Sequence, residues 1–209
     1  DGRDGSTSLT FDIEILQGPV IAASGAAAGQ LPEVRVFDAD GTLQFSFLAY
    51  ASTFRGGVNV ALGDLTGDGV PDIITAPGAG MSTEIRVFNG LDGTLVSSFV
   101  AYNPNFTGGV FVATGDVNDD GTPDIITGAA QSGPHVIVFD GTDTNQILHS
   151  FFAYDRFGFR SGVRVGSADV DGDGFDDIIT APNRGAQLVK VFDGEPGNTG
   201  VVIDSRNPF

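Results

Sequence analysis

The sequence predicts an all-β fold of four repeated units, each made of four short antiparallel strands. An acidic segment, GDLTGDGVPDIIT at 63–75, recurs in related form at 115–127 and 168–180, which sets a repeat of 52 or 53 residues. Each repeat holds four short segments of strand character separated by Gly, Asn and Asp. No stretch shows the apolar period of a helix. Such repeats are typical of the blades of a β-propeller.

The whole chain, residues 1–209, is expected to form a single propeller domain with blades at about 9–50, 56–102, 108–154 and 161–204. In the second unit the strands are predicted at 58–62, 72–76, 85–88 and 95–101. The second of these should be buried on both faces, because Ile73 and Ile74 leave it no polar side. The first unit should supply strands at 9–16, 20–23, 34–37 and 43–49, and residues 201–204 should complete the last unit.

Oxygen-bearing side chains occupy positions 1, 3, 5 and 9 of each acidic segment, and a glycine occupies position 6. Calcium takes six to eight oxygen ligands in irregular geometry, and the glycine permits the turn that folds alternate residues around one ion. The backbone carbonyl of position 7 can add a ligand. About three calcium ions are therefore predicted, bound by Asp64, Thr66, Asp68, Val70 and Asp72, by Asp116, Asn118, Asp120, Thr122 and Asp124, and by Asp169, Asp171, Asp173, Phe175 and Asp177.

An alternative is that these segments are plain hairpin turns, which need no metal. A plain turn has no use for the carboxylate at position 9, so the repeated pattern favours calcium. The loops are not EF-hands, because position 12 is threonine and strands flank them. Thr66 is the weakest ligand, so the first loop should bind its ion least tightly. The Gln-Gly-Pro turn at 17–19 lacks the acids and should hold no calcium.

The net charge of −17 and the pI near 4.1 argue against nucleic acid and against anionic membrane surfaces as partners. The sequence contains no cysteine, which excludes disulfides and thiolate nucleophiles. It has no apolar run long enough to cross a membrane, so no membrane insertion is expected. Weak calcium loops fill at the millimolar calcium found outside cells, which favours an extracellular or cell-surface location.

The repeats resemble the FG-GAP repeats, also described as VCBS repeats, of integrin-α-like propellers and of bacterial surface proteins. The resemblance covers roughly residues 18–194 and is carried by the acidic loop with its Ile-Ile-Thr ending, by Ala-Pro at 76–77 and 181–182, and by Phe with two glycines at 54–57 and 106–109. It implies calcium at loop positions 1, 3, 5, 7 and 9. Such propellers usually have more blades. We expect four blades closed within one chain; two chains sharing a ring, or a segment of a longer array, are the alternatives.

The expected function is an extracellular, calcium-stabilised module for binding or adhesion to a glycan or protein ligand, and not an enzyme. His135 and His149 occupy non-equivalent places, as surface or strand histidines do. One alternative is a structural, self-associating segment of a surface layer or fibre; another is a propeller-based polysaccharide lyase or hydrolase. Two sets of repeated residues could contact a ligand: Arg35, Arg86 and Lys190, and Tyr50, Tyr102 and Tyr154. Pairing with neighbouring acidic residues would also explain the basic set, and packing between blades would also explain the tyrosines.

Overall fold

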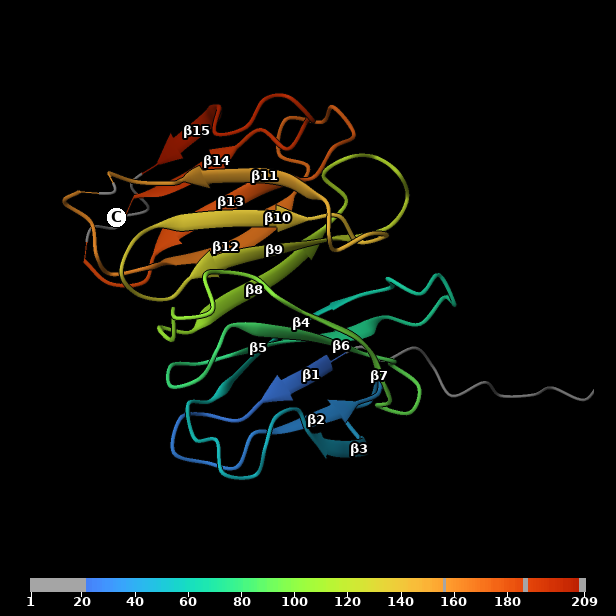
Figure 1. Ribbon diagram of the computed structural model, residues 1–209. Helices are drawn as coiled ribbons and strands as arrows, with labels where there is room; N and C mark the ends of the chain where they lie inside the picture. The colour runs from blue at the N-terminus through green and yellow to red at the C-terminus, as the bar shows by residue number, and fades with distance from the viewer. Residues whose placement is uncertain (1–21, 156, 186–187, 207–209) are drawn as a thin grey trace, which may run out of the picture.

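The computed structural model describes residues 22–155, 157–185 and 188–206, which form four antiparallel sheets in a row (Figure 1). The strands expected at 9–16 and the turn at 17–19 lie outside the described residues. The first sheet comprises β1 (Ala22–Gly25), β2 (Glu33–Phe37) and β3 (Leu43–Leu48). The second comprises β4 (Val58–Gly63), β5 (Asp72–Pro77), β6 (Glu84–Phe88) and β7 (Leu95–Val100).

The other two sheets repeat the four-stranded pattern of the second. The third comprises β8 (Val110–Gly115), β9 (Asp124–Ala129), β10 (His135–Phe139) and β11 (Ile147–Phe152). The fourth comprises β12 (Val163–Ala168), β13 (Asp177–Pro182), β14 (Val189–Phe192) and β15 (Val202–Arg206). Strands follow one another across each sheet in chain order, and no helix occurs among the described residues. The predicted all-β, propeller-type fold class is confirmed.

The register of the strands repeats from sheet to sheet as well. Each sheet has one register shift, always just before the phenylalanine that ends its next-to-last strand. Those phenylalanines are Phe37, Phe88, Phe139 and Phe192.

Within the part of the chain that is described, no helix is long and apolar enough to cross a membrane.

The hydrophobic core lies between the sheets and has one cluster at each of the three junctions. The second strands are buried on both faces, as their Ile-Ile pairs predict: Ile73, Ile74, Ile125 and Ile126 are all fully buried. Ile74 packs in the same cluster as Ile125, which shows how adjacent second strands share a core. Burial of each such side chain contributes about 1.5–3 kcal/mol to folding.

Side chains of the inner strands link neighbouring sheets through hydrogen bonds. Asn59 Nδ2 of β4 donates to the carbonyl of Val110 in β8 at 2.6 Å. Thr114 Oγ1 of β8 donates to the carbonyl of Leu62 at 2.7 Å, and Ser167 Oγ of β12 donates to the carbonyl of Thr114 at 2.5 Å. The orientation of each sheet is therefore set by its contacts with the next one.

The expectation that four blades close into a ring within one chain is wrong. Contacts between inner strands run from β1 to β4, from β4 to β8 and from β8 to β12, and the first and last sheets lie at opposite ends of the row (Figure 1). Small residues allow neighbouring sheets to approach closely: Gly63 lies against Thr114, and Gly115 lies against Ser167. The same junction is repeated three times, and among the described residues no comparable contact joins the first sheet to the fourth.

Candidate metal loops and the opposite ends of the sheets

Each acidic loop joins the first strand of a sheet to the second, between β4 and β5, β8 and β9, and β12 and β13. The carboxylate at position 1 holds the turn by accepting backbone N–H groups. Asp64 Oδ2 accepts from Gly69 at 2.8 Å, and Asp116 Oδ2 accepts from Gly121 at 2.9 Å. These two glycines have φ of +84° and +86°, a region that disfavours other residues, which explains glycine at position 6.

The carboxylates at position 9 begin the second strands and are fully buried: Asp72, Asp124 and Asp177. Each accepts a hydrogen bond from the backbone N–H of loop position 2, at 2.9–3.0 Å. In Asp72 the other oxygen, Oδ1, is buried without a hydrogen-bond partner in the described part of the chain. A buried carboxylate oxygen left in this state costs free energy unless a cation or donor meets it.

In the second and third loops, the position 9 carboxyls are costly to ionise without a cation. Burial raises the pKa of Asp124 to about 7, and the nearby carboxylates of Asp120 and Asp140 act in the same direction. Burial likewise raises the pKa of Asp177, with a further contribution from Asp171 and Asp173. Positive charge in these loops would therefore favour the ionised carboxylates.

The third loop contains an acidic cluster that could hold a metal ion. One carboxylate oxygen from each of Asp169, Asp171 and Asp177 lies within 4.8 Å of the others. The predicted ligands of the first and second loops form no such acidic group in the described ranges, where Thr66 and Asn118 occupy position 3. The third loop therefore has the best arrangement for a divalent cation, and its donors are oxygens only, as calcium prefers.

The predicted ligands at position 5 are engaged in hydrogen bonds within the loops. The carboxylates at position 5 accept the backbone N–H of position 7, at 2.8–2.9 Å in all three loops. These pairs are Asp68 with Val70, Asp120 with Thr122, and Asp173 with Phe175. Ligation by Asp173 would require its side chain to join the cluster formed by the other three aspartates.

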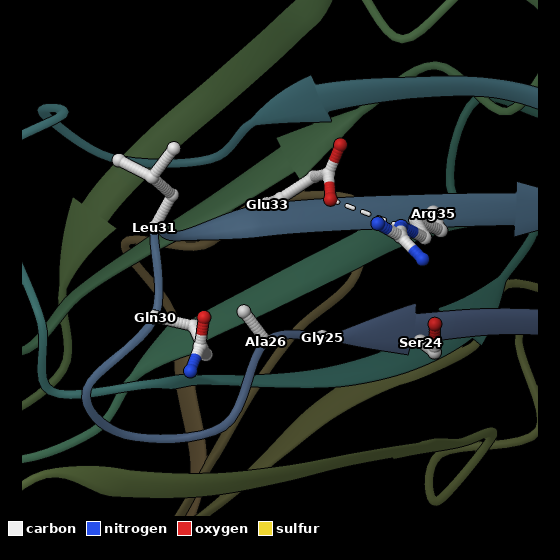
Figure 2. Close-up of a pocket in the computed structure, with 7 residues that line it drawn as sticks. All are labelled: Ser24, Gly25, Ala26, Gln30, Leu31, Glu33 and Arg35. Atoms are coloured by element: carbon white, nitrogen blue, oxygen red, sulfur yellow. Dashed lines mark hydrogen bonds and ion pairs between the residues drawn. The ribbon is translucent and has the colours of Figure 1, made fainter.

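The basic residues of the third strands are engaged by neighbouring groups. Arg35 Nε pairs with Glu33 at 2.9 Å beside a cavity of about 340 Å³ (Figure 2). Arg86 pairs with Glu84 at 2.8 Å and also donates to the carbonyl of Ala49 at 2.9 Å. Lys190 Nζ donates to the carbonyl of Ala153 at 2.9 Å. These contacts favour the structural interpretation of the three residues over a ligand-binding ring.

The repeated tyrosines also have structural contacts. Tyr50 donates to the carbonyl of Glu84 at 2.9 Å, Tyr102 to that of His135 at 3.0 Å, and Tyr154 to that of Leu188 at 2.8 Å. In each case the acceptor belongs to the next sheet along the row. The tyrosines therefore tie one sheet to the next, which is the packing role that the sequence left as one of two alternatives.

Four cavities lie at the ends of the sheets opposite the acidic loops. They are lined by loops joining second to third strands and by segments connecting consecutive sheets. The cavity between the third and fourth sheets has a volume of about 340 Å³ and contains two arginines, Arg160 and Arg184. The sequence analysis identified neither arginine as a candidate binding residue. Arg184 does depart from the repeat, because the equivalent position is Ala79 in the second unit and Gln131 in the third.

A row of four-stranded antiparallel sheets, with an acidic loop after the first strand of three of them, defines a repeat protein of the β-propeller type. Residues 108–149 match the family model of the FG-GAP repeat. The third repeat unit of the chain therefore matches the FG-GAP repeat family. It is 29% identical to integrin alpha-V of Gallus gallus over 156 residues, which cover 66% of this chain and 15% of that relative.

Among solved structures, the rhamnogalacturonan lyase PL11 of Bacillus licheniformis matches with a TM-score of 0.52 and 15% identity, covering 88% of this chain and 45% of the lyase. The rhamnogalacturonan lyase YesX matches with a TM-score of 0.49 and 14% identity, covering 86% of this chain and 43% of that one. At these identities the likeness to PL11 shows the fold alone. The chain spans less than half the length of these proteins and a smaller part of integrin alpha-V.

Proposed function

We propose that this chain is an extracellular, calcium-stabilised module that binds a glycan or a protein, and that it is not an enzyme. The observation that carries the proposal is the difference between the two ends of its sheets. One end holds three carboxylate loops, and the other holds cavities between connecting loops. The similarity to integrin alpha-V supports an extracellular or surface location.

Calcium, when bound, would supply positive charge at the loops and stabilise the folded state. In the third loop Asp169, Asp171 and Asp177 would hold it, and in the other loops the aspartates, Thr66 and Asn118 would do so. The position 1 and position 9 carboxylates keep the loops folded through their backbone hydrogen bonds. The loops are thereby preorganised, which reduces the entropy lost when an ion is bound.

The contacts of the two histidines support a binding role over catalysis. His149 is almost completely buried, and its ring nitrogens lie 2.8 Å from the carbonyl of Gly194 and 3.0 Å from Thr199 Oγ1. His135 Nε2 lies 3.0 Å from Ser150 Oγ. A general base must reach a substrate proton, and these nitrogens are already engaged with structural partners.

The test is a screen of immobilised glycans and extracellular proteins, performed with calcium and again with chelator. We expect at least one ligand to bind in calcium and to bind less tightly in chelator, because loss of the ions weakens the folded module. Depolymerisation of an acidic polysaccharide by the purified chain would refute the non-enzymatic assignment. Absence of any ligand, together with large calcium-dependent assemblies, would favour the structural alternative.

A further inference from the structure

We infer that the junction between the third and fourth sheets is a binding site for an anionic oligosaccharide, with Arg160 and Arg184 contacting the carboxylate of a uronic acid residue. The inference rests on the proposed function, because it names the ligand class and the place where that ligand binds. It starts from the cavity of about 340 Å³ at this junction, whose lining contains Gln131, Ser132 and Asn183 besides the two arginines.

The two arginines are available to a ligand. Both side chains are exposed, and neither makes a hydrogen bond or an ion pair with any part of the chain that the structure describes. Among the described residues, no carboxylate lines the cavity, although the chain has 27 acidic residues and only 10 Lys and Arg. Two uncompensated guanidinium groups in so acidic a protein make this junction a local site of positive charge, complementary to an anion.

Backbone hydrogen bonds fix the segments that carry the arginines. Ser161 Oγ donates to the carbonyl of Arg184 at 2.8 Å, so the two arginine-bearing loops are joined. The N–H of Ser132 donates to the carbonyl of Arg160 at 3.3 Å, which joins them to the third sheet. The guanidinium groups therefore project from a defined framework, and a guanidinium can bind a carboxylate through two parallel hydrogen bonds.

An apolar groove continues from this cavity and favours a sugar over other anions. The groove has a volume of about 170 Å³ and shares Gln131 and Ser132 with the cationic cavity. Its lining includes His135 and Phe152, whose rings stack with centroids 4.7 Å apart and planes 24° apart. Burial lowers the pKa of His135, which keeps this aromatic surface uncharged near neutral pH.

A sugar ring has an apolar face suited to such aromatic side chains and hydroxyl groups suited to amides and serines. The combined surface offers both, with Gln131, Asn183, Ser132 and Ser161 as hydrogen-bonding groups. A neutral sugar on the aromatic groove and an adjacent uronate on the arginines would use the whole surface. An acidic peptide would use the arginines but would not need the aromatic groove.

The equivalent junction between the first and second sheets provides a matched control. Arg55 stands at the repeat position of Arg160 and lines a cavity of its own. Its Nη1 donates to the carbonyls of Ser52 and Phe54, at 2.5 and 2.8 Å, so its guanidinium is already engaged. No second arginine lines that cavity, where Ala79 occupies the place of Arg184. Substitution of Arg55 should therefore leave binding of a uronate unchanged.

The experiment titrates the full chain in calcium with a hyaluronan hexasaccharide, which alternates glucuronate and N-acetylglucosamine, and follows backbone amide chemical shifts. We expect binding with shifts centred on Arg160, Arg184 and Gln131. The double substitution R160Q/R184Q should weaken binding at least about tenfold, as expected for loss of a charge-assisted hydrogen bond. R55Q should bind as the unmodified protein does, and R160Q/R184Q should keep the melting temperature of the unmodified protein.

Three results would overturn the inference. The first is no binding of the hexasaccharide, and the second is equal binding of its methyl ester, which lacks the negative charges. The third is unchanged affinity of R160Q/R184Q. An oligoaspartate peptide that binds through the same arginines more tightly than the hexasaccharide would show that the site is for acidic peptides. If the screen finds a ligand that binds elsewhere, the proposed function stands and only this site assignment fails.

Discussion

Replacing Asp171 by alanine should remove the calcium-dependent stability that the third loop contributes and leave calcium-free stability almost unchanged. Asp171 is exposed, and its Oδ1 accepts a hydrogen bond from the N–H of Asp173 at 3.2 Å. Loss of one exposed bond of this kind costs about 1 kcal/mol or less. In the presence of calcium the substitution also removes one of three carboxylates from the cluster of the third loop, so the stability that depends on the ion of this loop should be lost.

The size of the effect follows from mass action. Calcium sites of extracellular modules have dissociation constants of about 0.1–1 mM. At about 10 mM calcium, a site with a dissociation constant of about 0.1 mM stabilises the folded state by about 2.7 kcal/mol. For a chain of this size, that corresponds to about 5–11 °C in melting temperature. In chelator the same substitution should lower the melting temperature by about 2–4 °C at most.

Differential scanning calorimetry of both proteins, in calcium and in chelator, measures the effect. The matched control is Asp92→Ala, because Asp92 is also an exposed aspartate that accepts the N–H two residues ahead, at 2.9 Å from Thr94, but lies outside the acidic loops. Asp92→Ala should lower the melting temperature by the same amount in calcium and in chelator. Equal losses for Asp171→Ala with and without calcium would refute the assignment of the third loop as an ion site.

Three further outcomes are expected. Asp120→Ala should weaken calcium binding, measured by titration calorimetry, more than Thr66→Ala, because a carboxylate is lost in one case and a hydroxyl in the other; the reverse order would contradict the ligand assignment. Burial lowers the pKa of His149, so its contribution to stability is present above the unfolded pKa of about 6.5 and is lost as pH falls through the folded pKa. The free energy of unfolding, measured with urea, should therefore fall more between about pH 7.5 and 5.5 in the unmodified protein than in His149→Gln. Tyr102→Phe should lower the free energy of unfolding by about 1–3 kcal/mol, because the carbonyl of His135 loses a hydrogen bond, and an unchanged urea midpoint would argue against this.

The open row of sheets raises the question of what covers its ends. The inner sheets have a neighbour on each side: in the second sheet, Ile73 packs in the cluster shared with the first sheet and Ile74 in the cluster shared with the third. Within residues 22–206, as far as they are described, the first and fourth sheets have a neighbour on one side only. Ultracentrifugation in calcium distinguishes pairing of two chains, which would double the mass of 21.5 kDa, from a monomer.

Much of the fold could be predicted because the signals are local. Ile73 and Ile74 predict a strand buried on both faces, and the structure places both in β5, with no exposed surface. Gly69 at position 6 predicts a sharp turn, and its φ of +84° agrees. The gathering of Asp169, Asp171 and Asp177 follows from their alternation within one loop. Such features depend on residues close together in the chain, so the sequence contains the necessary information.

The sequence by itself therefore determined the strand pattern, the repeat and the chemistry of the acidic loops. Only the tertiary structure decided that the four sheets form an open row and that Arg160 and Arg184 line one cavity with Gln131. The rotation from one sheet to the next results from side-chain contacts across a junction, such as Ser167 with Thr114, between residues that lie 53 apart. No periodic pattern in the sequence encodes that rotation, and it governs both the shape of the row and the cavities between the sheets.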